Sequence, residues 1–185
     1  MKTSRLRIVG AVLGAATLLF PTAGSPQAST EPERYAMMYV EAVQRRDYDA
    51  MAALTYQDDL RQLREAVRRI IASDTEGEWV ATLEVADSAE FLGLSAPDVY
   101  VRFLRSTMPG PEADEFFGSM TVAMIGRLLS PDPGVVVVRY EMSVDLEDAP
   151  PPMEGSVRMK QHGDAWRVLL DTGVLDWLEA LAAQA

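Results

Sequence analysis

The stretch from residue 136 to residue 146 constrains the fold of this chain more than any other part of the sequence. Its apolar members share one parity and are Val136, Val138, Tyr140, Met142, Val144 and Leu146. Its polar members share the other parity and are Arg139, Glu141, Ser143 and Asp145. Because successive side chains of a strand point to opposite faces, the pattern predicts a long strand with one buried and one solvated face, typical of antiparallel sheets.

Shorter alternating stretches lie on both sides of this strand. The apolar parity before it holds Met120, Val122, Met124 and Leu128, and the apolar parity after it holds Val157, Met159, Trp166, Val168 and Leu170. Turn residues separate the stretches at 131–134, 148–152 and 162–164. The sequence therefore predicts an antiparallel meander. We expect its outward face to carry Arg127, Arg139, Glu141, Arg158, Lys160 and Arg167.

Helical periodicity dominates the chain before this meander. Apolar residues recur at helical spacing in 30–46, 47–54, 58–73 and 95–108, and again in the last stretch, 174–185. Between them, 82–85 reads as a short strand. An antiparallel sheet with one apolar face needs a cover, and the helices supply it. The predicted fold class is therefore α+β, with N-terminal helices on the sheet and a closing C-terminal helix.

The first residues have the order of a cleavable secretory signal. Lys2, Arg5 and Arg7 precede an uncharged run from 8 to 20, and small residues follow up to Ser25. The run is shorter than the roughly 20 residues of a membrane-spanning helix. We expect cleavage after Gly24, giving a signal peptide at 1–24, a single domain at 25–185 and a secreted or periplasmic location.

Charge and cysteine content exclude several classes of function. The chain has 28 acidic against 17 basic residues, a formal net charge of −11 that becomes −14 when the three bases of the signal are removed. Such a chain repels nucleic acid and anionic membranes. It has no cysteine, so disulfides, thiolate nucleophiles and lipid-anchor cysteines are excluded. We expect no nucleic-acid partner and no membrane span after signal cleavage.

Two short motifs resemble the nuclear transport factor 2-like superfamily. The first is 46–51, Arg-Asp-Tyr-Asp-Ala-Met, after the opening helix, and the second is the closing strand pair at 159–168 with its inward Trp166. The resemblance implies a curved, cone-like sheet wrapped around helices, with a pocket inside the cone. It implies no particular reaction, because function in such folds resides in individual site residues.

The residues favour a non-catalytic role. The only histidine, His162, falls in a hairpin turn, which leaves no base for a serine triad and no histidine metal site. The inward strand positions hold no carboxylate, although a ketosteroid-isomerase type of site needs one. The acidic cluster at 141–148 lacks the spacing of a calcium loop. We therefore expect no catalytic residues, no metal and no cofactor.

A candidate ligand pocket is predicted on the apolar face of the sheet. Its lining residues are Phe103, Met124, Tyr140, Met142, Met159 and Trp166. Methionine and tryptophan suit an adaptable apolar ligand, but the same residues also suit a filled core. Three roles stay open: a domain holding a small apolar ligand or docking to an envelope protein, an isomerase-like or polyketide-cyclase-like enzyme using Asp58, Asp59 or Glu84, and a structural homodimer with a filled core.

Overall fold

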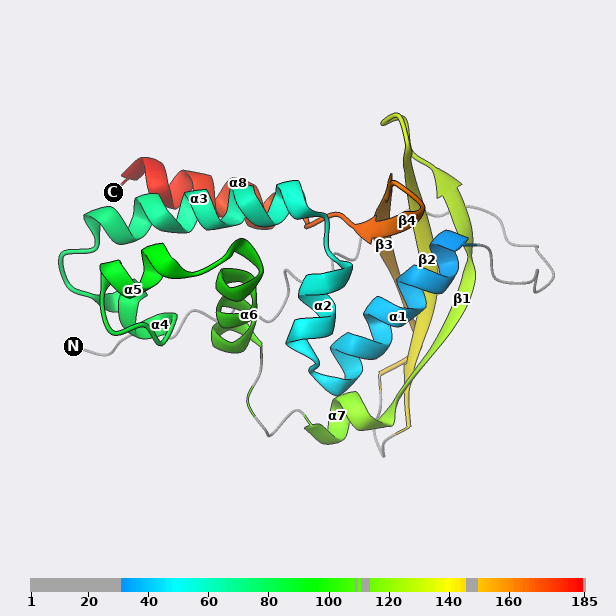
Figure 1. The fold of residues 1–185 in the computed structure, drawn as a ribbon. Helices are drawn as coiled ribbons and strands as arrows, with labels where there is room; N and C mark the ends of the chain where they lie inside the picture. The colour runs from blue at the N-terminus through cyan, green and yellow to red at the C-terminus, as the bar shows by residue number, and fades with distance from the viewer. Residues whose placement is uncertain (1–30, 109, 111–113, 146–149, 185) are drawn as a thin grey trace.

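The computed structural model describes residues 31–184 apart from 109, 111–113 and 146–149 (Figure 1). Its helices are α1 (Glu31–Arg45), α2 (Tyr48–Leu54), α3 (Gln57–Ser73), α4 (Glu78–Thr82), α5 (Ser88–Gly93), α6 (Ala96–Thr107), α7 (Asp114–Ser119) and α8 (Thr172–Gln184). Its strands are β1 (Met120–Leu129), β2 (Val135–Val144), β3 (Met153–His162) and β4 (Ala165–Val168). The strands form one antiparallel sheet in the order β1-β2-β3-β4. The α+β class, the antiparallel meander and the C-terminal helix are confirmed.

The helices form two groups relative to the sheet. Helix α1 lies along one face of the sheet, which we call the inner face, and α2 lies beside α1 (Figure 1). Helices α3, α4, α5, α6 and α8 gather at the other end of the molecule. The opposite, outer face of the sheet is covered by none of the helices that the structure describes.

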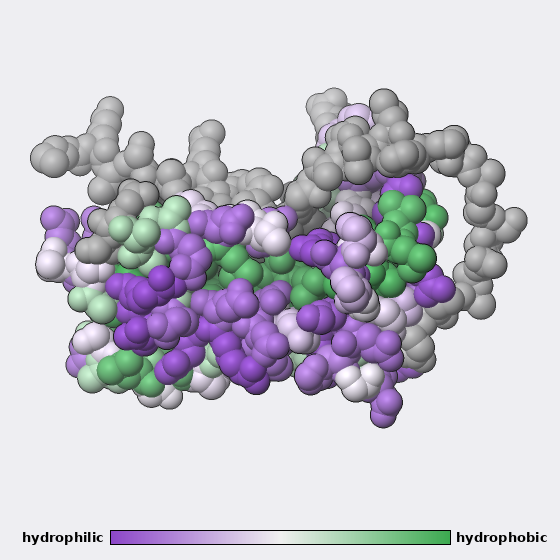
Figure 2. All heavy atoms as spheres, turned by 90° about the horizontal axis from the view of Figure 1, so that it is seen from above, coloured by the Kyte–Doolittle hydropathy of each residue, from purple (hydrophilic) through white to green (hydrophobic). Residues whose placement is uncertain are grey.

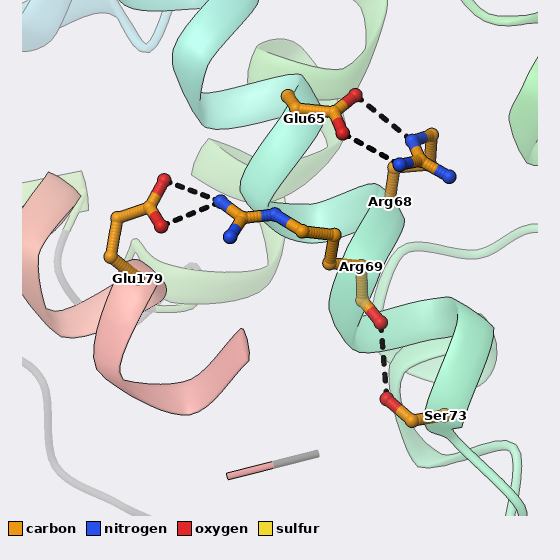
Figure 3. A network of polar contacts seen from close by, with 5 residues as sticks. All are labelled: Glu65, Arg68, Arg69, Ser73 and Glu179. Carbon is orange, nitrogen blue, oxygen red and sulfur yellow. Dashed lines mark hydrogen bonds and ion pairs between the residues drawn. The ribbon is translucent and has the colours of Figure 1, made fainter. Parts of the chain in front are cut away.

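The C-terminal helix packs along α3 rather than against the sheet. Leu178 of α8 is fully buried, and the carboxylate of Glu179 accepts hydrogen bonds of 2.6 Å from Arg69 of α3 (Figure 3). Exposed ion pairs of this kind contribute at most about 1 kcal/mol. The apolar contact therefore supplies most of the free energy that holds α8 in place.

Local capping signals in the sequence are reproduced by the structure. The Asp47 side chain accepts a 3.0 Å hydrogen bond from the N–H of Ala50 at the start of α2. Ser95 and Asp98 form a reciprocal capping box at the start of α6. These helices begin where a short polar side chain can satisfy backbone N–H groups that have no partner within the helix.

The strand expected at 82–85 is wrong, because this segment ends helix α4. The Asp74 carboxylate accepts hydrogen bonds from the N–H groups of 78–80, which fixes the first turn of that helix. Leu83 and Val85 are nevertheless buried. The turn that follows α4 buries both side chains, so their burial does not require a strand.

A β-bulge in β1 changes which face its last residues occupy. The register with β2 shifts at Gly126, whose φ of +138° is a conformation that L side chains rarely adopt. Beyond the bulge, Arg127 pairs with the buried Val138 on the inner face, and Leu128 lies on the outer face. Arg127 forms a 3.7 Å ion pair with Glu33 of α1. The predicted outward placement of Arg127 was therefore wrong, and Leu128 does not share the face of Met120, Val122 and Met124 that its parity indicates.

Gly155 is required by the close approach of a tyrosine ring from the neighbouring strand. Tyr140 pairs with Gly155 across β2 and β3, and a Cβ at 155 would lie 2.5 Å from two of its ring carbons. We expect Gly155→Ala to lower the free energy of unfolding by about 1 to 3 kcal/mol, because overpacking forces a buried ring to move. Denaturant unfolding measures this loss.

Gly93 provides a matched control for that substitution. It ends α5, and nothing lies within 4 Å of the position that a Cβ would take there. Gly93→Ala should therefore change the free energy of unfolding by no more than about 1 kcal/mol. Equal losses at the two positions would show that the Tyr140 ring does not restrict the size of the side chain at position 155.

Candidate functional site

The six predicted pocket residues all belong to one hydrophobic core. They come from α6 and from all four strands, as Phe103 on α6, Met124 on β1, Tyr140 and Met142 on β2, Met159 on β3 and Trp166 on β4. Phe103, Tyr140, Met142 and Met159 are buried, and Met124 and Trp166 are partly buried and pack against the same core. Whether any of them contacts a ligand stays a prediction.

The strand register brings only some of these residues together. Met124 pairs directly with Tyr140 on the inner face. Tyr140 pairs with Gly155 of β3, whereas Trp166 pairs with Gln161 of the same strand. Six residues along a strand span roughly 20 Å at about 3.3 Å each. Trp166 therefore lies at the far end of the sheet from Tyr140.

Phe103 is held among helices. Helix α6 packs against α2 and α3, and Phe103 is one of its buried residues. The residues of the predicted pocket thus line a long stretch of core. Strands β1 and β2 place only three of the six predicted pocket residues side by side, namely Met124, Tyr140 and Met142.

A cluster of buried hydroxyl groups lies next to this part of the core, and we call it the hydroxyl cluster. The hydroxyls of Tyr39 on α1 and Tyr100 on α6 are 3.2 Å apart and share a hydrogen bond. Thr55, which follows α2 and is fully buried, donates a 2.8 Å hydrogen bond to the carbonyl of Met51 and lies beside Tyr100. Tyr140 approaches Tyr39 from β2.

The hydroxyl cluster was not predicted from the sequence, because its tyrosines belong to apolar helical faces. Tyr39 falls on the buried face of the first helix, where a tyrosine reads as a packing residue. A buried tyrosine hydroxyl nevertheless needs a partner. Two tyrosines on buried faces of different helices were therefore a usable signal for a shared hydrogen bond.

Burial keeps the tyrosines of this cluster in their neutral form. Desolvation raises the pKa of Tyr39 well above its ordinary value, and it also raises the pKa of Tyr100. Burial, together with the neighbouring Tyr39, raises the pKa of Tyr140 to about 12. No carboxylate among the described residues contributes to these shifts. The cluster therefore offers hydrogen-bond donors without a carboxylate base.

The helix-borne acids of the enzyme alternative lie in other surroundings. Asp58 is exposed and pairs with Arg61, and Glu84 is exposed in a left-handed backbone conformation. Asp59 is half-buried, and its Oδ2 accepts a 2.8 Å hydrogen bond from the N–H of Leu170. Desolvation raises the pKa of Asp59. Its basic neighbours are Lys160 and Arg158 of β3, and no tyrosine contributes to this shift.

His162 is exposed at the end of β3, next to the turn formed by Gly163 and Asp164. Its ring contacts the ring of Tyr56 edge-on, with centroids 5.8 Å apart. Within the described ranges, no three His, Cys, Asp or Glu side chains gather closely enough to hold a metal. Glu147 and Asp148 of the predicted acidic cluster lie outside the described residues.

Comparisons with protein-family models, with curated proteins and with solved structures found no match to this chain. The resemblance to the nuclear transport factor 2-like superfamily therefore stays a prediction. In the part of the chain that the structure describes, no helix has both the length and the apolar character needed to cross a bilayer.

Proposed function

We propose that this chain is an exported, non-catalytic domain that docks a partner protein along the outer edge of strand β1. One observation carries the proposal. The predicted pocket residues are part of the core, whereas three large apolar side chains of β1 are exposed. A domain with a packed interior and an apolar strand edge is suited to binding another chain.

The exposed apolar side chains of β1 lie close together in sequence. Ile125 and Leu128 are each 45% exposed, and Leu129 is 84% exposed. Seen from above, the surface carries an apolar area at the end of the molecule where the sheet lies (Figure 2). Leaving such side chains in water is unfavourable by about 25 cal/mol for each Å² of apolar surface. Covering them would contribute binding free energy.

The two edges of the sheet differ in how they are closed. At the β4 edge, Thr55 forms a bridge with Val168, and the N–H of Tyr56 donates a 2.8 Å hydrogen bond to the Val168 carbonyl. Among the described residues, no strand pairs with the outer edge of β1, which is ten residues long. A long edge of this kind is a template for an added strand.

These features define the chemistry of the partner. An unpaired strand edge is matched by an extended segment, which adds to the sheet through main-chain hydrogen bonds. Arg127 is the only charged residue among the ten of β1, so charge does not select the partner. We infer that the partner contributes an extended, mainly apolar segment. Covering of the edge by residues 25–30 or by a second copy of the chain would be an alternative outcome of the test.

Hydrogen exchange of the natively exported protein tests the docking proposal. Amides of β1 should exchange at least about tenfold more slowly in the native complex than in the purified domain, because an added strand protects them. Leu128→Lys with Leu129→Lys should abolish this protection, and Leu92→Lys on α5, another exposed apolar position, should preserve it. Identical exchange of β1 in both samples would overturn the proposal, as would protection that persists in the single chain.

The export part of the proposal is supported by the charged, apolar and small-residue order of residues 2–25. Intact-mass measurement of the protein from the soluble envelope or medium fraction should give a chain that begins between Gly24 and Thr30. A full-length mass found in a membrane pellet would contradict export with cleavage.

A small apolar ligand is the second candidate function. It is supported by the hydroxyl cluster, since Tyr39 of this cluster lies near Tyr140, whose cross-strand partner is the apolar Met124. Ligand sites combine apolar walls with a few polar groups in this way. Substitution of Met142 by alanine distinguishes this candidate from a filled core.

A further inference from the structure

Two basic side chains face each other on the outer face of the sheet. Lys160 of β3 and Arg167 of β4 are direct cross-strand partners, a position in which Cβ atoms lie about 4.5 to 5.5 Å apart. Like charges placed opposite each other in a sheet are destabilising. A negative charge placed between them would relieve this repulsion.

No acidic side chain of the described residues forms an ion pair with either of them. Nine of the twelve other described Lys and Arg side chains are in an ion pair, so most cations of this protein are paired. The ammonium group of Lys160 lies 4.7 Å from the ring centroid of Tyr56. Arg167 donates a 3.1 Å hydrogen bond to the carbonyl of Trp166.

Asp59 attracts Lys160 electrostatically, but it is not within ion-pair distance, and its Oδ2 accepts a hydrogen bond from the N–H of Leu170. The next cation along β3, Arg158, is already paired with Asp132 at 2.9 Å. Lys160 and Arg167 therefore keep donors that an added anion can use.

Apolar groups flank the two cations in the same row of the sheet. Val135 of β2 is the cross-strand partner of Lys160 on its other side, and it is buried. The Tyr56 ring lies beside Lys160 at the β4 edge. Val135 is too buried to contact a ligand, so a ligand here would meet the two cations beside one aromatic side chain, Tyr56.

We propose that Lys160 and Arg167 form a binding site for a small organic anion, with a carboxylate or phosphate group between the two cations and an apolar body against Tyr56. The planar guanidinium can donate two parallel hydrogen bonds to either group, and the ammonium adds a point charge. The site is on the outer face of the sheet and is separate from the docking edge of β1.

Calorimetric titration of the purified domain with benzoate, phenyl phosphate and inorganic phosphate tests this site and distinguishes the two anionic groups. Arg167→Gln and Lys160→Gln should each weaken binding of the preferred probe about tenfold, the usual effect of losing one charge-assisted hydrogen bond. Arg45→Gln removes the same charge from an exposed position on α1 and should leave binding unchanged. Tyr56→Leu should weaken the aromatic probes and spare inorganic phosphate.

Stability measurements give a second readout that a merely structural pair would not produce. Without an anion, the double-mutant cycle of Lys160→Gln and Arg167→Gln should show repulsion between the two side chains, and a saturating anion should remove that repulsion. The proposal is overturned if none of the three probes binds the parent protein. It is also overturned if Arg45→Gln weakens binding as much as Arg167→Gln does.

Discussion

Met142→Ala should lower the free energy of unfolding by about 2 to 5 kcal/mol, the range for removing a large buried side chain from a packed core. Met142 is 6% exposed. On the inner face of the sheet it pairs with Val122 of β1 and Met153 of β3. Truncation would leave a cavity between three strands that neighbouring side chains can only partly fill. Denaturant unfolding monitored by circular dichroism measures the loss.

The same substitution separates a filled core from a ligand pocket. Met38→Ala on α1 is the matched control, because Met38 is 42% exposed and such surface changes usually stay within about 0.5 kcal/mol. A loss at Met142 as small as that at Met38, together with altered binding of an apolar dye, would favour the ligand candidate. A large loss with no dye binding by the parent protein would remove that candidate.

Short-range patterns in the sequence predicted the fold class and most of its elements. Alternation around Tyr140 specified β2, since each strand residue faces opposite to the next. Capping residues such as Asp47 and Ser95 marked helix starts because the groups that they satisfy lie within one turn. Predictions that depended on neighbours in sequence were therefore reliable.

The errors arose where a conformation depended on one backbone position or on a distant side chain. The bulge at Gly126 reverses the parity of Arg127 and Leu128, and an isolated glycine in an alternating pattern only hints at a bulge. The Asp74 carboxylate lies before α4 in the sequence and accepts a hydrogen bond from the N–H of Trp79 in its first turn. The chain enters the helix through Gly77, whose φ is positive. A pattern of alternating apolar residues predicts neither the bulge nor the hydrogen bond of Asp74.

The candidate site was predictable in residue type but not in arrangement. Parity placed Tyr140 and Trp166 on the same inner face, and both contribute to the core. Parity does not give the register between strands, and the register sets these two residues far apart. The pairing of Lys160 with Arg167 was hidden for the same reason, since it depends on the register of β3 with β4.

Alkaline pH should destabilise this protein strongly, through the tyrosines of its core. A tyrosine in the unfolded chain loses its proton near pH 10, whereas burial raises the pKa of Tyr140 in the folded protein to about 12. Between these values the folded state holds a proton that the unfolded state has lost, so the free energy of unfolding falls as the pH rises. The stabilisation is fully present below pH 10 and disappears towards pH 12.

The expected size of this effect follows from the pKa difference. At about 1.4 kcal/mol for each pH unit, Tyr140 alone accounts for a loss of about 3 kcal/mol, and the raised pKa values of Tyr39 and Tyr100 act in the same direction. Denaturant unfolding at a series of pH values measures the slope. Tyr140→Phe removes one ionisable group from the core, so its free energy of unfolding should decline by about 3 kcal/mol less than that of the parent. Parallel declines in the two proteins would show that Tyr140 ionises as easily in the folded state as in the unfolded one.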